Sequence, residues 1–224
     1  MNDLHIHIEI DPELYTKNPD SSELGKKIIS NSIELIYDIG FELFTFKKLG
    51  KRINSPESSI YRYFENKHKL LIYLTSWYWT WMEYRIVFAT TNISSAENRL
   101  NNALDLLTKP ILIDNDFSYV DEVMLSEIIF SESIKAYHTK KVDEENENGS
   151  FTSYKSVVNR VSDIVLEIKP TFQYPHMLIS TVIEGAHHQK YFSEHLPSLT
   201  DMTSDKNAIT KFYKELVFNL LKPN

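Results

Sequence analysis

Apolar residues recur along the chain at steps of three and four, the spacing at which side chains share one face of an α-helix. The first stripe predicts a helix over about 21–39. Asp20, three residues before Glu23, has the spacing of an N-terminal cap, and Gly40 is the residue type that commonly ends a helix. The chain is therefore expected to fold as helices from this point onward.

Two short helices are predicted next, separated by a tight turn. Thr45 is a suitable N-cap for the first, in which Leu49 and Ile53 are the buried positions. Asn54 stands where the chain reverses, and asparagine tolerates a left-handed backbone. Ser55-Pro56 then restarts a helix, with serine as the cap and proline at the first helical position.

The helix that follows, over about 56–63, is predicted to be held by Ile60 and Phe64, four residues apart. Its other side chains are expected to lie outside the core and to leave one face able to contact a partner: Glu57, Ser58, Ser59, Arg62 and Tyr63.

A long helix is predicted from Asn66, a suitable N-cap, to about residue 90. Its apolar stripe consists of Leu70, Leu74, Trp77, Trp81, Tyr84 and Phe88. Further helices are expected over about 95–109, 117–140, 151–169, 174–193 and 205–221. The fold class is therefore all-α.

Two segments stand apart from this helical pattern. In residues 1–19, apolar side chains alternate with polar ones from Leu4 to Ile10, which predicts a loose strand or a docked tail. The acidic stretch Asp143 to Ser150 is expected to form an exposed, mobile loop.

Composition narrows the function classes. The five glycines are too far apart for any glycine-rich phosphate loop, and the absence of cysteine excludes thiolate chemistry and zinc sites built on sulfur. No signal peptide or membrane-spanning run is predicted, so a cytoplasmic protein is expected. Catalytic motifs are also missing, and an enzyme is not expected.

Charge is divided unevenly along the chain. The net charge is −7, yet residues 45–69 hold seven basic and two acidic side chains, a net charge of +5. Such a basic island on an acidic body is typical of a protein that meets phosphate on one face only, although a solvated cationic helix would give the same count.

This order of helices, with the residues that mark it, resembles the DNA-binding module of the tetracycline-repressor (TetR) family of bacterial regulators. The matching segments are Gly40-Phe41, Thr45-Phe46-x-x-Leu49-Gly50, Ser59-Ile60-Tyr61-Arg62-Tyr63-Phe64 and Lys67-x-x-Leu70. Residues 1–19 precede this module as an N-terminal extension. The resemblance implies a three-helix helix-turn-helix domain over 20–66 and a helical effector-binding and dimerisation domain over 67–224.

The resemblance also implies roles for individual residues. It assigns phosphate contacts to Thr45, Lys47, Tyr61 and Lys67, and an approach to base edges to Glu57, Ser58, Ser59 and Tyr63, with Arg62 on the same exposed helix. The turn departs from the family pattern, because Asn54 replaces a glycine and Ser55 a branched apolar residue. Glu57 is either an acceptor for a cytosine amino group or a solvated charge at a helix N-terminus.

For the later helices, the resemblance implies an apolar effector pocket and a homodimer interface. The aromatic residues could wall the pocket or simply form core: Trp77, Trp81, Tyr84, Phe88, Phe130, Tyr137 and Tyr154. The dimer is expected to pair the last two helices through Leu178, Val182, Gly185, Ala186, Phe212, Leu216 and Leu220. No cofactor is implied.

A metal site is also considered, because Glu184-x-x-His187 has the spacing that carboxylate-bridged metal sites use on bundle helices. Such a site needs a second copy and two further glutamates, and the other match, Glu65-x-x-His68, lies in the basic island. No metal is therefore expected.

The sequence thus predicts a sequence-specific DNA-binding regulator, a ligand-responsive repressor that acts as a homodimer on a double-stranded operator. The alternative is a helical dimeric scaffold or small-molecule sensor whose helix-turn-helix has lost DNA binding.

Overall fold

The computed structural model describes residues 8–111, 119–132, 134–202, 205, 207–222. Within these residues the chain forms eleven α-helices, three short 3₁₀ helices and no strand. The elements in chain order are η1 (Pro12–Leu14), η2 (Pro19–Ser21), α1 (Glu23–Leu43), α2 (Phe46–Arg52), α3 (Glu57–Ile60), α4 (Lys67–Thr90), α5 (Ala96–Thr108), α6 (Glu122–Glu132), α7 (Ile134–Tyr137), α8 (Val142–Glu147), α9 (Thr152–Ile168), α10 (Pro175–His195), η3 (Pro197–Leu199) and α11 (Ala208–Leu221). The all-α prediction is confirmed. No helix in the described ranges is long and apolar enough to cross a membrane.

The chain divides into two compact units. The first consists of Met1–Thr80 and Ile111–Thr152, and the second of Trp81–Pro110 and Ser153–Asn224, so α4 runs through both.

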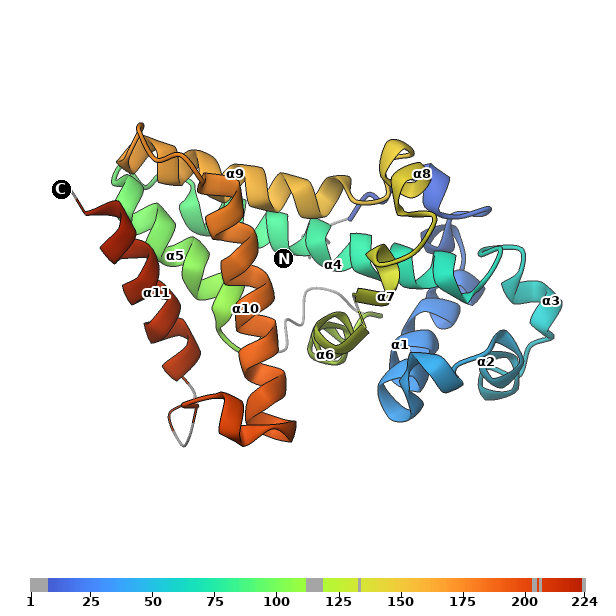
Figure 1. Ribbon diagram of the computed structural model, residues 1–224. Helices are drawn as coiled ribbons and strands as arrows, with labels where there is room; N and C mark the ends of the chain where they lie inside the picture. Colours follow the sequence, from blue (N-terminus) through green and yellow to red (C-terminus); the bar gives the residue numbers. More distant parts are fainter. Residues whose placement is uncertain (1–7, 112–118, 133, 203–204, 206, 223–224) are drawn as a thin grey trace, which may run out of the picture. The chain divides into compact units, whose positions relative to one another are not determined.

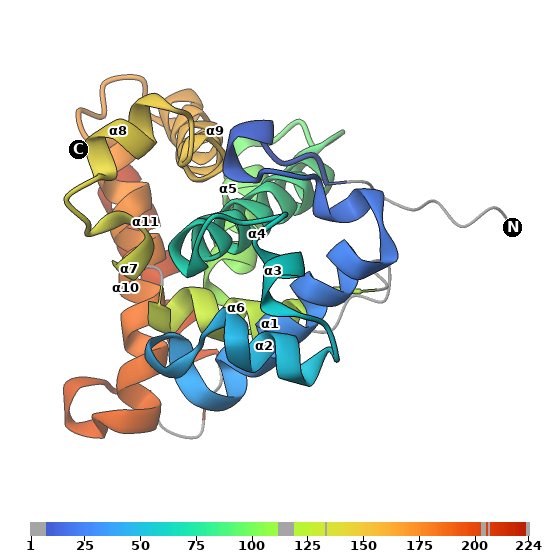
Figure 2. The same ribbon diagram turned by 90° about the vertical axis from the view of Figure 1, so that its right-hand side faces the viewer.

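In the first unit, α1 packs against α2 and α6, and α2 packs against α3, as Figure 2 shows for this group of helices. Apolar side chains from these elements, among them Ile33, Leu49 and Phe64, are fully buried. This core holds the two short helices that follow α1 in a fixed orientation relative to it.

In the second unit, α5 packs against both α10 and α11, and the three helices lie beside one another in Figure 1. Thr108 donates a hydrogen bond to Thr210 at 3.0 Å between their hydroxyl oxygens, and Arg99 pairs with Glu167. On α11, Ile209, Tyr213 and Val217 are buried.

The start of α1 differs from the prediction. Ser22, and not Asp20, is its N-cap, because the Ser22 hydroxyl accepts a hydrogen bond from the Gly25 amide at 3.2 Å. Asp20 lies in η2, where its carboxylate accepts a hydrogen bond from the Tyr119 hydroxyl. The predicted break at Gly40 is confirmed, since Gly40 has a φ of 75°, which interrupts the helix before Phe41.

The N-terminal segment is a docked tail over the part that the structure describes. Residues 1–7 lie outside that part, so half of the predicted alternation is not tested, and Ile8 and Ile10 are buried without forming a strand. The backbone amide of Thr16 donates to the carbonyl of Tyr63 at 2.8 Å, which joins the tail to the segment after α3.

The acidic segment predicted to be a loop is instead the short helix α8. Acidic side chains in a first helical turn are favoured by the helix dipole. Glu145 is also buried, with Oε1 2.9 Å from His68 Nε2, and this contact holds the segment in place.

Candidate nucleic-acid interface

The turn between α2 and α3 has the local geometry that the sequence predicts. The Thr45 hydroxyl accepts a hydrogen bond from the Lys48 amide at 3.2 Å and caps α2. Asn54 has a φ of 53°, in the left-handed region. The Ser55 amide donates to the Gly50 carbonyl at 2.9 Å, so the turn closes through backbone bonds.

The helix α3 is shorter than predicted and begins one residue later. Pro56 is its N-cap and Ser55 makes no capping bond, because the φ of −64° that the proline ring imposes is combined with an extended ψ of 144°. After Ile60 the chain continues in turns, and the amide of Phe64 still bonds to the Ile60 carbonyl at 3.2 Å. Ile60 and Phe64 are fully buried, as predicted.

Outward from this anchor, α3 and the turn after it present polar side chains. Ser58, Tyr61 and Arg62 are exposed, while Glu57 and Ser59 are half-buried. The Tyr61 hydroxyl donates to Glu57 Oε1 at 3.3 Å, and its ring packs on Phe46 with 5.0 Å between centroids. These side chains form one ridge of hydrogen-bonding groups.

Tyr63 does not belong to this ridge. The expectation that it lies outside the core is wrong, because its side chain is 2% exposed and turned toward the N-terminal tail and α1. Its hydroxyl oxygen lies 2.7 Å from the Ser22 hydroxyl and accepts from Lys17 at 3.3 Å. Burial raises the pKa of Tyr63, but these two hydrogen bonds and the nearby positive charges hold that pKa below its usual value.

Two lysines of α2 are available to meet phosphate. Lys47 and Lys51 are exposed and form no ion pair or hydrogen bond with any described residue. Lys48 donates to the Leu43 carbonyl at 2.8 Å. Arg52 binds Asp38 at 2.8 Å and Glu34 at 2.7 Å, and these contacts raise the pKa of its guanidinium. Two of the seven basic side chains of the predicted island, Lys48 and Arg52, are therefore bound within the protein itself.

The ammonium group of Lys67 is committed to the backbone that links α1 to α2. It donates to the carbonyls of Phe41, Glu42 and Phe44 at 2.9, 3.2 and 3.3 Å, and it lies 4.7 Å from the centre of the Phe41 ring. An ammonium has three donors, and all three are used here. This position differs from the phosphate contact that the resemblance implies.

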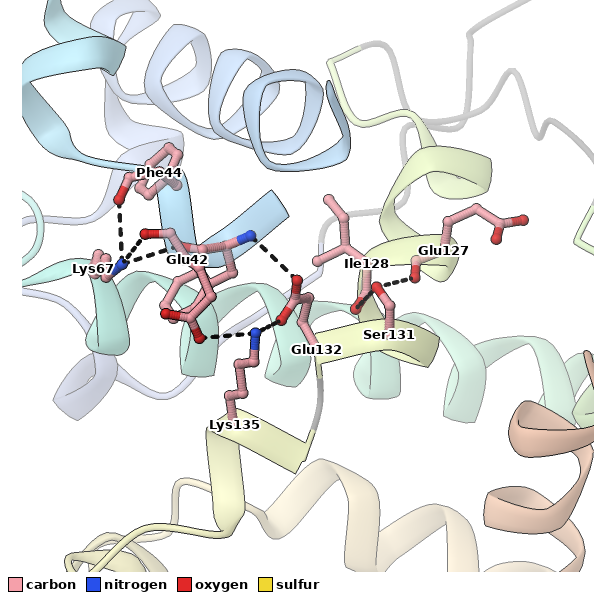
Figure 3. A network of polar contacts seen from close by, with 9 residues as sticks. Glu42, Phe44, Lys67, Glu127, Ile128, Ser131, Glu132 and Lys135 are labelled. Carbon is pink, nitrogen blue, oxygen red and sulfur yellow. Dashed lines mark hydrogen bonds and ion pairs between the residues drawn. The ribbon is translucent and has the colours of Figure 1, made fainter. Parts of the chain in front are cut away.

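The same link is held from its other side by α6 and α7, as Figure 3 shows. The Phe41 amide donates to Glu132 Oε1 at 3.2 Å. Lys135 lies between Glu132 and Glu42, with N–O distances of 2.6 and 2.9 Å, and its hydrogen bond and charge lower the pKa of the Glu42 carboxyl. The orientation of α2 and α3 is thus fixed by contacts from α4, α6 and α7.

Comparison with known proteins identifies this region. The model of the bacterial regulatory proteins of the tetR family matches residues 28–74, which include most of α1, all of α2 and α3, and the start of α4. The chain carries the TetR-family DNA-binding domain. No curated protein matches the chain. The TetR-type domain makes the protein a DNA-binding transcriptional regulator, and the family is one of regulators and not of enzymes.

Several solved structures match the chain, and two of them are similar over nearly its whole length. One is the fatty acid degradation regulator FadR from Bacillus halodurans, at 16% identity and a TM-score of 0.62, covering 96% of this chain and all of that one. The other is the superantigen PfiT, at 13% identity and a TM-score of 0.58, covering 93% of this chain and all of that one. At these identities the likeness shows the fold: a TetR-type domain followed by helices.

The aromatic residues predicted to wall an effector pocket do not share one environment. Trp77 and Trp81 are buried, whereas Tyr84 is 40% and Phe88 79% exposed, so the predicted stripe does not stay inside the protein. From Leu70 to Trp79 every residue of α4 is buried. This part of the helix is therefore covered on all sides and has no separate exposed face. Phe130, Tyr137 and Tyr154 are half-buried, and the Tyr154 hydroxyl donates to Glu184 Oε1 at 2.8 Å.

The residues predicted for the dimer interface fall into three groups by burial. Leu178, Val182 and Ala186 are buried within one chain, and Gly185 and Leu216 are half-buried. Phe212 and Leu220 are 56% and 46% exposed on α11. The described residues include no group of three or more histidine, aspartate or glutamate side chains that could hold a metal ion.

Proposed function

We propose that this TetR-family regulator is a sequence-specific, ligand-responsive repressor that acts in the cytoplasm as a homodimer. The supporting observation is the ridge formed by Ser58, Tyr61 and Arg62, which faces outward while Ile60 and Phe64 anchor the same segment from behind. Side chains on such a helix contact base edges in the major groove. Lys47 and Lys51, exposed on α2, supply charge for the phosphates beside that groove.

The roles assigned to individual residues change with the geometry. We assign base-edge contacts to Ser58, Ser59 and Arg62, with Glu57 oriented by Tyr61. Because the Thr45 hydroxyl caps α2, its proton remains free to donate to a phosphate oxygen. Tyr63 and Lys67 are proposed to support the interface from within and to make no contact with DNA.

A homodimer is proposed because α10 and α11 expose apolar side chains in addition to those that they bury. Met177 on α10 is 65% exposed, and Phe212 and Leu220 on α11 are similarly open to solvent. Two copies pairing through these helices would bury those side chains. A symmetric dimer presents two reading helices to successive major grooves, about 34–36 Å apart along the duplex.

The proposed response to a ligand follows from this spacing. Two forms of the dimer that differ in the spacing of their reading helices fit the operator differently. A ligand that binds more tightly to the form that does not fit the operator lowers the population of the operator-bound form by an amount set by the difference between its affinities for the two forms. The proposed effector is an apolar molecule, and within the second unit the hydrogen-bonded pair Tyr154 and Glu184 provides a polar group for it.

The experiment is a binding titration of the purified protein against its own upstream genomic region and an unrelated fragment of equal length, at low and moderate salt. Sequence-specific recognition keeps the upstream fragment bound, and a protected footprint with two half-sites visible, at a salt concentration that releases the unrelated one. Equal release of both fragments would favour a scaffold or sensor whose helix-turn-helix no longer binds an operator.

A further inference from the structure

A polar groove lies in the first unit, away from the ridge described above. Its volume is about 460 Å³, and its walls come from the N-terminal tail, the start of α4 and α8. The residues that matter most are Glu13 and Tyr15 from the tail, Glu65 just before α4, Lys69 in its first turn, and Glu144 and Glu145 from α8. The groove is large enough for a small organic molecule.

The most buried of the four carboxylate residues that line the groove is Glu145. The residue is only 3% exposed, and Oε1 is 2.9 Å from His68 Nε2. Its second oxygen, Oε2, is buried and accepts no hydrogen bond from the described residues. A buried carboxylate oxygen without a donor costs free energy, so a ligand that brings a donor to this atom is stabilised there.

The charge of the walls favours a cation over an anion. Glu13, Glu65 and Glu144 are exposed, and none of them forms an ion pair with the described residues. The basic side chains of the walls are those of His68, Lys69 and Lys141, against the four carboxylates of Glu13, Glu65, Glu144 and Glu145. Burial first, and then the charges of Asp20, Asp11 and Glu9, raise the pKa of Tyr15, as expected on a negative side of the molecule.

We infer that this groove binds a small organic cation whose ammonium or guanidinium group donates to the free oxygen of Glu145. Charge-assisted hydrogen bonds of this kind are about twice as strong as neutral ones. The exposed glutamates of the walls, Glu13, Glu65 and Glu144, attract the second charge of a diamine. Since Glu65 and Asn66 belong to the turn between α3 and α4, the ligand contacts the segment that follows the reading helix.

The test is isothermal titration of the full-length protein, without DNA, with three molecules that share a four-carbon chain: 1,4-diaminobutane, 1,4-butanediol and succinate. The expected result is saturable binding of the diamine to one site per chain, with no heat from the diol or the dianion. Because no DNA is present, a negative result leaves the proposed operator recognition untouched.

Variants then locate the site. Glu145→Gln keeps the shape of the side chain and removes its charge, and it is expected to weaken diamine binding at least tenfold, about 1.4 kcal/mol. Glu147→Gln, on the same helix but outside the groove, is the matched control and leaves the affinity unchanged. Glu144→Gln, at an exposed wall position with no partner to lose, gives a smaller reduction and serves if Glu145→Gln fails to fold.

Three results would overturn the inference. The first is the absence of saturable diamine binding. The second is equal affinity for the diol, which would show that charge does not matter. The third is an equal reduction in the Glu147→Gln and groove variants, which would show only diffuse attraction to an acidic protein.

Discussion

Tyr63 and Lys67 are four residues apart in the sequence, and the polar atoms of both side chains form hydrogen bonds within the protein. The Tyr63 hydroxyl meets Ser22 and Lys17, and the Lys67 ammonium meets three backbone carbonyls. Releasing either group to a duplex would leave acceptors or donors without partners at a cost of about 1–3 kcal/mol each. At the scale of single residues, the bonds that a side chain already makes within the protein therefore distinguish the proposed supporting residues from the proposed contact residues.

Gly185 gives a residue-scale prediction about packing. A Cβ at this position would lie 2.0 Å from the hydroxyl oxygen and 2.9 Å from Cζ of Tyr213, a buried side chain of α11. Gly185→Ala is expected to lower the free energy of unfolding by about 1–3 kcal/mol, because overpacking outweighs the helix preference of alanine. Urea unfolding measures the change.

A second substitution checks the cause of that destabilisation. Tyr213→Phe removes the atom that the new methyl group would strike first. In the Tyr213→Phe background, Gly185→Ala should cost clearly less than in the natural chain. An equal cost in both backgrounds would place the strain elsewhere.

His187 gives a prediction about pH. Burial, with the charges of His188 and Lys190, lowers the pKa of His187 from 6.5 to about 3. Between these values the unfolded chain binds more protons than the folded one, so the stabilisation is complete above about pH 6.5 and is lost as the pH falls toward 3. The slope from this group is at most about 1.4 kcal/mol per pH unit.

Urea unfolding at pH 7, 6 and 5 tests the assignment to His187. His187→Gln should reduce the pH slope, while His195→Gln, at the exposed end of the same helix, should leave it as it is. A slope that survives His187→Gln unchanged would assign the pH dependence to other groups.

At the scale of elements, local signals were sufficient for the helices that have a cap, a periodic stripe and a stop. Thr45, Asn54 and the pair Ile60 and Phe64 have the conformations and burial that the sequence predicts. These features depend on residues within one or two turns of each other. The helix-turn-helix was predictable for that reason.

What could not be predicted depends on contacts between distant segments. The acidic stretch forms α8 because Glu145 meets His68, a residue 77 positions away. Tyr63 is buried because the N-terminal tail docks beside it, and no pattern within the third helix indicates that docking. The environment of the aromatic stripe of α4 likewise depends on which helices cover each part of it.

Lys67, which binds the link between α1 and α2, allows a prediction about how these elements are held together. Lys67→Ala is expected to lower the free energy of unfolding by about 1–3 kcal/mol, because three carbonyls lose their donor. The salt dependence of DNA binding should stay as steep as in the natural chain. Thermal unfolding and a salt titration of operator binding measure the two effects.

Lys47→Ala is the matched comparison, because this lysine is exposed and makes no bond within the described chain. Its stability should stay within about 0.5 kcal/mol of the natural value. The slope of log affinity against log salt should flatten by about 0.9 for each phosphate that the protein no longer neutralises. If Lys67→Ala flattened the slope and left stability unchanged, Lys67 would bind a phosphate after all.

At the scale of the whole molecule, operator recognition is expected to depend on dimerisation, because the ridge of one chain contacts only a few base pairs. We expect Phe212→Glu to convert a dimer to a monomer at micromolar concentration, since Phe212 is 56% exposed on α11 and the dimer would have to bury the new charge without a partner. Size-exclusion chromatography with light scattering measures the mass. Operator affinity should fall as the dimer dissociates, while helix content and the melting temperature of the monomer stay close to normal.

The matched control is Phe88→Glu, which places the same charge on an even more exposed phenylalanine, 79% exposed near the end of α4. This variant should remain a dimer and bind the operator as the natural chain does. If Phe212→Glu also remained a dimer, the pairing face would not be α11. If both variants became monomers, the dissociation would reflect added charge in general, because Phe88 is not in the proposed interface.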